Sequence, residues 1–196
     1  MKKRLSGFSL LEVLVTMLLV AFGLLGLAAM ETRMMNSSNE SFQRSQAVAI
    51  LADMTARMKA AGTNAGSYVT TGTLGKGNTT WPSGCSGLAI GPTRDLCEWS
   101  TVLQGANETT AGGNTAGAMV NAVGCITQLQ APNGTSGICT PGIYDVSVAW
   151  QGSSPTVANS NNSCGTGNYT DINGTANDAY RRLITARVVV PQNACN

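Results

Sequence analysis

The pattern of hydrophobic and polar positions begins with a long apolar run. Residues 8–30 are almost wholly apolar and hold one ionisable side chain, Glu12. At about 1.5 Å of rise per residue, a helix of this length crosses a hydrocarbon core of roughly 30 Å. A basic leader, residues 1–7, carries Lys2, Lys3 and Arg4, which keeps that end in the cytoplasm and places the remainder outside. The pattern predicts a membrane anchor that carries an external domain.

A helical pattern continues through residues 31–61, which contain no proline or glycine. Apolar residues recur there at spacings of three and four and form one stripe: Ala47, Leu51, Met54, Met58 and Ala61. The other side of the helix carries Gln43, Arg44, Asp53, Arg57 and Lys59. We expect one helix from about residue 8 to 60, ended by Gly62, whose second half packs on a globular head.

Residues 62–196 are expected to form this head. Residues 62–92 suggest an irregular connection. Thr93 to Gln104 suggests a short helix with Thr93 as its N-cap. The apolar face of this helix contains Leu96, Trp99, Val102 and Leu103. Alternating patterns predict strands at residues 125–130, 143–151 and 183–190, with loops at 105–117 and 152–178. The predicted fold class is α+β, with a long N-terminal α-helix packed on a small antiparallel sheet.

Two features of the N-terminal segment point to a specialised role. A carboxylate near the middle of a bilayer costs on the order of 2.5–3.5 kcal/mol, so Glu12 is a functional candidate. In an ordinary secretory signal the small residue at the cleavage site follows the apolar stretch, whereas here Gly7 precedes it. The alternative interpretation is an uncut signal anchor in which the glutamate has no role.

The order Gly7-Phe8-Ser9-Leu10-Leu11-Glu12 before an apolar run resembles the class III prepilin signal of type IV pilins and type II secretion pseudopilins. This resemblance implies a pilin-like fold, cleavage after Gly7 by prepilin peptidase and N-methylation of Phe8. It also implies that Glu12 pairs with the terminal amine of a neighbouring subunit, and that an inner-membrane assembly platform is a partner. Many major pilins have a proline in this helix, whereas residues 8–30 have none and contain only Gly23 and Gly26 as weak points.

Short segments of the head resemble the PilV-type minor pilins, the type IV pilus modification proteins; these segments are residues 95–99, 124–126, 144–152 and 180–182. The resemblance implies a minor pilin of a tip or priming complex that contacts other minor pilins and supports twitching and adhesion. Its head would lie in the periplasm before it enters the pilus. A minor pseudopilin of a type II secretion system, and an anchored periplasmic binding protein that never polymerises, remain as alternatives.

Six cysteines follow the membrane segment, at Cys85, Cys97, Cys125, Cys139, Cys164 and Cys195. An even number outside the cytoplasm predicts three disulfides, for which fifteen connectivities exist. We expect sequential pairing, Cys85 with Cys97, Cys125 with Cys139 and Cys164 with Cys195, because short loops close easily. The formal net charge of +2 falls to near −1 without the leader, so no nucleic-acid partner is expected.

Catalytic motifs are absent from the sequence. The chain contains no histidine, which excludes Ser-His-Asp and Cys-His arrangements, and we expect neither enzymatic activity nor a cofactor or metal. The stretch from Asp171 to Asp178 has oxygen ligands around a glycine, but position twelve of a calcium loop would be Arg182 rather than glutamate. We favour a turn that precedes the last strand. Candidate contact residues are Trp81, Trp99, Trp150 and Tyr180, of which Trp99 and Trp150 are expected in the core.

Overall fold

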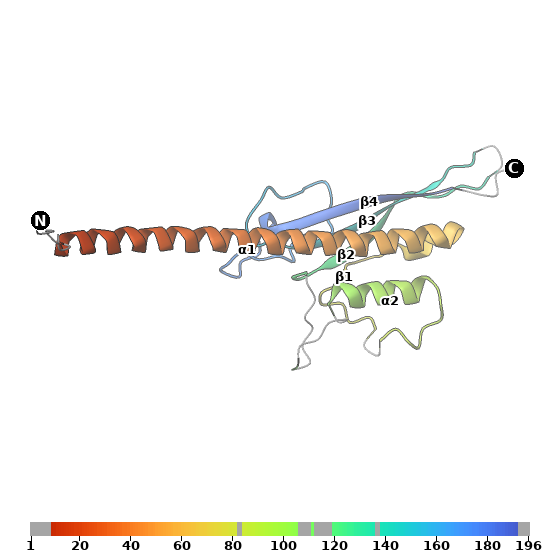
Figure 1. Ribbon diagram of the computed structural model, residues 1–196. Helices are drawn as coiled ribbons and strands as arrows, with labels where there is room; N and C mark the ends of the chain where they lie inside the picture. Colours follow the sequence, from red (N-terminus) through yellow and green to blue (C-terminus); the bar gives the residue numbers. More distant parts are fainter. Residues whose placement is uncertain (1–8, 82–83, 106–110, 112–118, 136–137, 192–196) are drawn as a thin grey trace, which may run out of the picture. The chain divides into compact units, whose positions relative to one another are not determined.

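The computed structural model describes residues 9–81, 84–105, 111, 119–135 and 138–191. The chain divides into two compact units, Met1–Ser41 and Phe42–Asn196. Figure 1 labels the α-helices and strands and colours the chain along the sequence, and eight elements are described. These are α1 (Leu10–Ala61), the 3₁₀ helix η1 (Gly62–Tyr68), β1 (Leu74–Gly75), α2 (Pro92–Leu103), β2 (Val123–Gln130), β3 (Gly142–Gln151), the 3₁₀ helix η2 (Asp178–Tyr180) and β4 (Arg181–Val190).

The long helix predicted from residue 8 to 60 is confirmed by α1, although residue 8 itself lies outside the described residues. Gly62 ends the helix as expected. Its φ of +56° lies in the left-handed region, which glycine adopts without steric cost just after a helix C-terminus. The chain then continues as η1, an element that the sequence interpretation did not anticipate.

The predicted antiparallel sheet is confirmed and has the strand order β1-β2-β3-β4. The expected strands at residues 125–130, 143–151 and 183–190 correspond to β2, β3 and β4. Register places Cys125 opposite Ser147, and Ser147 opposite Thr185. The sequence interpretation missed β1, which pairs Leu74 with Gly124 in the stretch expected to be irregular. Two residues are too few to produce an alternating pattern.

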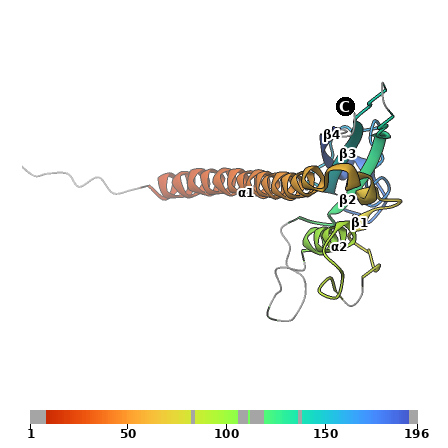
Figure 2. The same ribbon diagram turned by 90° about the vertical axis from the view of Figure 1, so that its right-hand side faces the viewer.

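One side of the sheet, which we call the helix face, packs against the helices. The predicted stripe of α1 is buried there, and the sheet contributes alternate residues. This core contains Ala47, Leu51, Met54 and Met58 of α1, Trp99 and Leu103 of α2, and Ile126, Tyr144, Val146, Val148, Trp150, Val188 and Val190 of the strands. Figure 2 shows α2 and the last turns of α1 beside the strands. Burial of this face joins α1, α2 and the sheet in one core.

The opposite side of the sheet, the loop face, is covered by the connection between β3 and β4. A second cluster of buried side chains lies there: Val123, Ala149, Cys164 and Tyr169. Odd-numbered residues of β3 and β4, and of β2 before its register shift at Gln128–Gln130, lie on this face. Even-numbered residues of the same stretches lie on the helix face, as the period of two requires. Both faces of the sheet are therefore covered by residues of the head.

The N-cap of α2 differs from the prediction. The helix begins at Pro92, with Gly91 at the N-cap position and no capping hydrogen bond from a side chain, so the expectation that Thr93 caps it is wrong. Proline fits the first helical position because its φ is already helical and its missing N–H would have no partner there. The first turn of α2 contains the acidic residue Asp95, which interacts favourably with the helix dipole.

Candidate functional site

The N-terminus of α1 is capped by Ser9. The backbone N–H of Leu11 donates to Ser9 Oγ over 3.3 Å, and the N–H groups of Glu12 and Val13 donate to the Ser9 carbonyl oxygen at 3.0 and 3.2 Å. Glu12 therefore lies in the first turn of the helix, where a carboxylate interacts favourably with the helix dipole. The sequence interpretation gave Ser9 no role, although Ser-x-x-Glu is the residue order of a capping box.

Glu12 is surrounded by an exposed apolar surface, which we call the apolar rod. Fourteen large apolar side chains between residues 10 and 30 are exposed: Leu10, Leu11, Val13, Leu14, Val15, Met17, Leu18, Leu19, Val20, Phe22, Leu24, Leu25, Leu27 and Met30. Within the described residues, this is the one helix long and apolar enough to cross a membrane. An apolar surface of this extent requires lipid or protein around it.

The two residues of the expected processing site, Gly7 and Phe8, lie outside the described residues. Cleavage and N-methylation therefore stay predictions from the sequence. Glu12 itself is described and exposed in the first turn of α1. A carboxylate in an apolar surface is costly to cover unless a cation meets it. The geometry thus places one acidic group where the apolar rod begins.

The predicted disulfide between Cys85 and Cys97 is confirmed, and it ties the preceding loop to α2. The predicted bonds from Cys125 to Cys139 and from Cys164 to Cys195 are wrong, because Cys125 is bonded to Cys164. Cys139 lies in the β2–β3 connection and is itself disulfide-bonded, while Cys195 lies outside the described residues.

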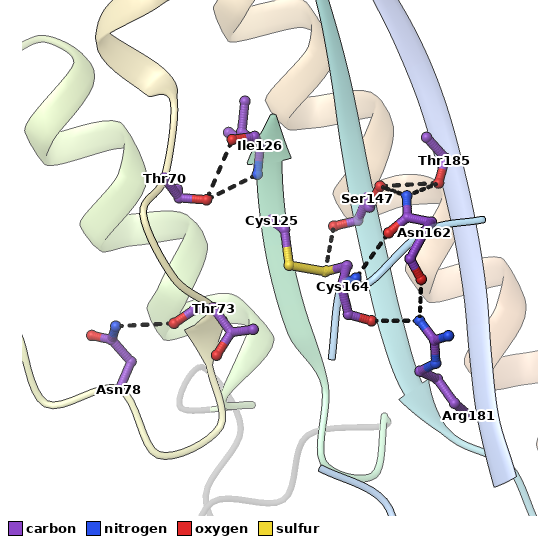
Figure 3. Close-up of a disulfide and its surroundings, with 10 residues drawn as sticks. All are labelled: Thr70, Thr73, Asn78, Cys125, Ile126, Ser147, Asn162, Cys164, Arg181 and Thr185. Atoms are coloured by element: carbon purple, nitrogen blue, oxygen red, sulfur yellow. Dashed lines mark hydrogen bonds between the residues drawn. A yellow bond between two sulfur atoms is a disulfide. The ribbon is translucent and has the colours of Figure 1, made fainter. Parts of the chain in front are cut away.

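The physical reason for this pairing is the path of the chain over the loop face. Cys125 lies on β2 with its side chain on that face, and the connection after β3 folds back across the sheet and brings Cys164 to it (Figure 3). Proximity in the sequence favoured Cys139. However, the rest of β2, as far as Gln130, carries the chain away from Cys125 before the connection that contains Cys139 begins.

A buried arginine holds the same loop. The Arg181 side chain, only 5% exposed, donates to the carbonyl oxygens of Asn162 at 2.7 Å and Cys164 at 2.9 Å, and also to that of Asn159. The Asn162 amide donates to Ser147 Oγ at 2.8 Å, as Figure 3 shows. The sequence interpretation noted Arg181 only as part of a resemblance, since no local pattern marks a buried arginine.

An ion-pair network joins α1 to α2. Arg57 bonds Asp53 at 3.0 Å, Asp95 at 2.7 Å and Glu98 at 2.8 Å. The hydrogen bond from Arg57 holds the pKa of the Glu98 carboxyl below its usual range. Tyr68 donates its hydroxyl proton to Asp95, and burial together with this bond raises the pKa of Tyr68. Arg57, which the sequence places on the polar side of the helix, is therefore partly covered, because α2 lies against that side.

The stretch from Asp171 to Asp178, which resembles a calcium loop in part, forms turns. Asp171 Oδ1 accepts the backbone N–H groups of Asn173 and Thr175, both at 2.9 Å, so the predicted turn is confirmed. Asp178 Oδ1 accepts the N–H of Gly167 at 2.9 Å, in a different turn. In the described part of the chain, no three His, Cys, Asp or Glu side chains gather as metal ligands would.

The four aromatic candidates are at least partly covered. Trp99 and Trp150 are buried in the core as expected, each 2% exposed. Trp81 packs partly buried against the helix-face core, and Tyr180 packs in the same way against the loop-face cluster. These aromatic rings contribute chiefly to packing within the head.

The capped helix start, Glu12 and the apolar rod form the part of the chain that matches a known family. Residues 2–28 match the family model of the prokaryotic N-terminal methylation motif. No curated protein and no solved structure matches the chain. The motif supports a membrane-anchored type IV pilin-like or pseudopilin protein that is processed by prepilin peptidase and interacts with other pilin components.

Proposed function

We propose that this chain is a minor pilin of a type IV pilus that takes part in assembly or priming of the filament. The observation that carries the proposal is the position of Glu12, in the first turn of an exposed apolar helix and within the methylation motif. The order of α1 followed by a disulfide-bonded α+β head also supports it.

The proposed mechanism is assembly rather than catalysis. Prepilin peptidase cuts after Gly7, and Phe8 becomes the methylated N-terminus. The apolar rod holds the subunit in the inner membrane until the assembly platform moves it into the filament, where apolar helices of neighbouring subunits replace lipid. There the Glu12 carboxylate accepts a hydrogen bond from the terminal ammonium of the next subunit. This charge-assisted hydrogen bond is stronger than a neutral one and fixes the axial register of the subunit.

The head is proposed to lie in the periplasm and then on the pilus, where it supplies lateral contacts. The PilV-type resemblance of the head supports a place in a tip or priming complex, with effects on twitching and adhesion. Two disulfides in the described residues suit an oxidising compartment outside the cytoplasm. We propose no enzymatic activity, because the chain lacks histidine and its acidic residues in α2 form ion pairs.

A minor pseudopilin of a type II secretion system is the second candidate, since the methylation motif serves both systems equally well. Deletion of the chain discriminates between them. Loss of surface pili and twitching supports the pilus, and loss of exoprotein secretion with intact pili supports the secretion system. An anchored protein that never polymerises would leave both outputs unchanged.

The decisive experiment replaces Glu12 with alanine. Glu12→Ala is expected to abolish assembly while the protein still accumulates in the membrane, because the apolar rod is unchanged. Glu31→Ala is the matched control: Glu31 is also exposed on α1 but lies beyond the apolar run, and its removal should leave assembly intact. Normal pilus output from Glu12→Ala would refute the proposal. Mass spectrometry of the mature chain should find a methylated Phe8 at its N-terminus.

A further inference from the structure

β4 is the last strand of the sheet and pairs on one side only. It runs from Arg181 to Val190 and pairs with β3 along its whole length, from Arg181 opposite Gln151 to Val190 opposite Gly142. In the strand order, nothing among the described residues follows β4, and Figures 1 and 2 draw no strand beyond it. A strand edge of this length is a template for another strand.

The hydrogen-bond pattern shows which backbone groups point outward. The Ile126 N–H donates to Thr70 Oγ1, and the Thr70 N–H donates to the Ile126 carbonyl oxygen. These two backbone groups of Ile126 therefore point away from β3. Val146, opposite Ile126, then directs its groups to Ala186 of β4. Even-numbered residues of β4 are therefore bonded to β3, and odd-numbered residues direct their N–H and carbonyl groups outward. These outward residues are Leu183, Thr185, Arg187 and Val189.

The other edge of the sheet is closed by the chain itself. β1 pairs with the start of β2, the Lys76 N–H donates to the Ala122 carbonyl oxygen at 2.9 Å, and Thr70 covers Ile126. The β4 edge has no such cover among the described residues, and none of its outward backbone groups has a hydrogen bond from another described segment. The two edges thus differ: among the described residues, β1 and Thr70 cover the other edge as far as Ile126, whereas the β4 edge has no cover along its length.

The side chains along this edge indicate the chemistry of a partner. On the helix face, Ile184 and Ala186 are only half-buried. On the loop face, Arg187 bonds Asp145 at 2.9 Å while its side chain stays 60% exposed. β4 contains three arginines and no acidic residue, so the β4 strand of a second copy would bring further positive charge and no carboxylate to the edge, whereas an acidic segment would pair with Arg187.

We propose that the β4 edge binds an extended segment of a different subunit by strand addition. The segment has apolar, β-branched side chains on the side of Ile184 and Ala186, and a carboxylate beside Arg187. The inference adds an interaction surface to the head. Because the surface lies wholly within the head, the outcome of the binding test does not depend on whether the chain enters a pilus or a secretion system.

The test uses the full chain in detergent and a blocked ten-residue peptide of alternating valine and glutamate, labelled for fluorescence anisotropy. A peptide with proline at every second position is the negative control. The variants are Thr185→Pro and Thr185→Ala, which both lose the Thr185 hydroxyl, whereas only the proline removes the outward N–H. Proline at such an edge position leaves the β3 pairing intact. Circular dichroism checks that both variants stay folded.

Saturable binding is expected for the wild type and for Thr185→Ala, and binding about tenfold weaker for Thr185→Pro, since one hydrogen bond and the close strand approach are lost. Equal binding by the two variants would overturn the proposal. The absence of binding by the wild type at millimolar peptide would overturn it as well. Self-association of the wild type that Thr185→Pro abolishes would show that the occupant is a second copy, contrary to the proposal.

Hydrogen exchange on the wild type supplies a test that needs no variant. Without peptide, the Thr185 and Arg187 amides should exchange faster than the Ala186 amide, which is bonded to β3. With saturating peptide, exchange at Thr185 and Arg187 should slow by about tenfold or more, because those amides become hydrogen-bonded. Unchanged exchange at both positions in the presence of bound peptide would place the binding elsewhere and refute the assignment of the edge.

Discussion

Removal of the Cys125–Cys164 disulfide is expected to destabilise the chain more than removal of the Cys85–Cys97 disulfide. The perturbation is a double alanine substitution of each pair, so that no free thiol remains. The two bonds differ in the length of chain that they close, with sequence separations of 39 and 12 residues. The third disulfide, to which Cys139 belongs, stays intact in both variants.

The magnitude follows from the entropy that each bond removes from the unfolded chain. In the chain-entropy relation, closing the longer loop contributes about 3.9 kcal/mol and closing the shorter one about 2.8 kcal/mol at 25 °C. The longer bond should therefore be worth about 1 kcal/mol more. The Arg181 hydrogen bonds to the same loop remain in the variant, so the native fold should persist while its free energy of unfolding falls.

The assay is denaturant unfolding of the purified full chain in detergent under non-reducing conditions, followed by tryptophan fluorescence, since Trp99 and Trp150 are buried. Hydrogen exchange of residues 159–164 adds a local measurement and should accelerate only when the longer bond is removed. A larger loss of free energy for the Cys85/Cys97 variant would refute the reasoning. So would unchanged exchange at residues 159–164 in the Cys125/Cys164 variant.

Three further substitutions test the packing and the charges of the head. Gly124→Ala should cost about 1–3 kcal/mol of unfolding free energy, because a Cβ at Gly124 would clash with the Trp99 ring; a melting temperature equal to the wild type would contradict this. Met54→Ala should cost about 2–5 kcal/mol, since Met54 is fully buried, as measured by denaturant unfolding. Glu98→Gln should cost about 0.5–1 kcal/mol at pH 7, because the Arg57 pair is partly exposed. Folding lowers the pKa of Glu98, so the contribution of the Glu98 carboxylate to stability is complete above its unfolded pKa of about 4.3. That contribution is lost as the pH falls through the folded pKa. A destabilisation by Glu98→Gln that persists at pH 2 would contradict this reasoning.

The elements with a strong period could be predicted from the sequence. The apolar stripe from Ala47 to Met58 is buried as its spacing indicates, and β3 and β4 alternate as predicted. The expected stop at Gly62 is correct because only glycine adopts its φ at no cost. In each case the information is local, since a helix face, a strand face or a turn is encoded within a few neighbouring residues.

The features that the sequence did not reveal depend on contacts between distant segments. Cys125 meets Cys164 because a loop crosses the sheet, and no spacing rule encodes that path. Arg57 is half-buried only because α2 packs beside it. Ser9 is a different case: its capping pattern is local and could have been recognised from Ser-x-x-Glu.

The magnitudes at the N-terminus separate the burial of the apolar rod, in lipid or in protein, from the axial register of the subunit. Burying one large apolar side chain contributes about 1.5–3 kcal/mol, so the fourteen exposed side chains of the apolar rod together contribute on the order of 20–40 kcal/mol when lipid or protein covers them. A buried carboxylate costs only about 2.5–3.5 kcal/mol. Glu12 therefore cannot decide whether the helix is buried. In the proposed filament, Glu12 instead decides where along a neighbouring helix the subunit stops, because only one axial position would bring the terminal ammonium of the next subunit to it.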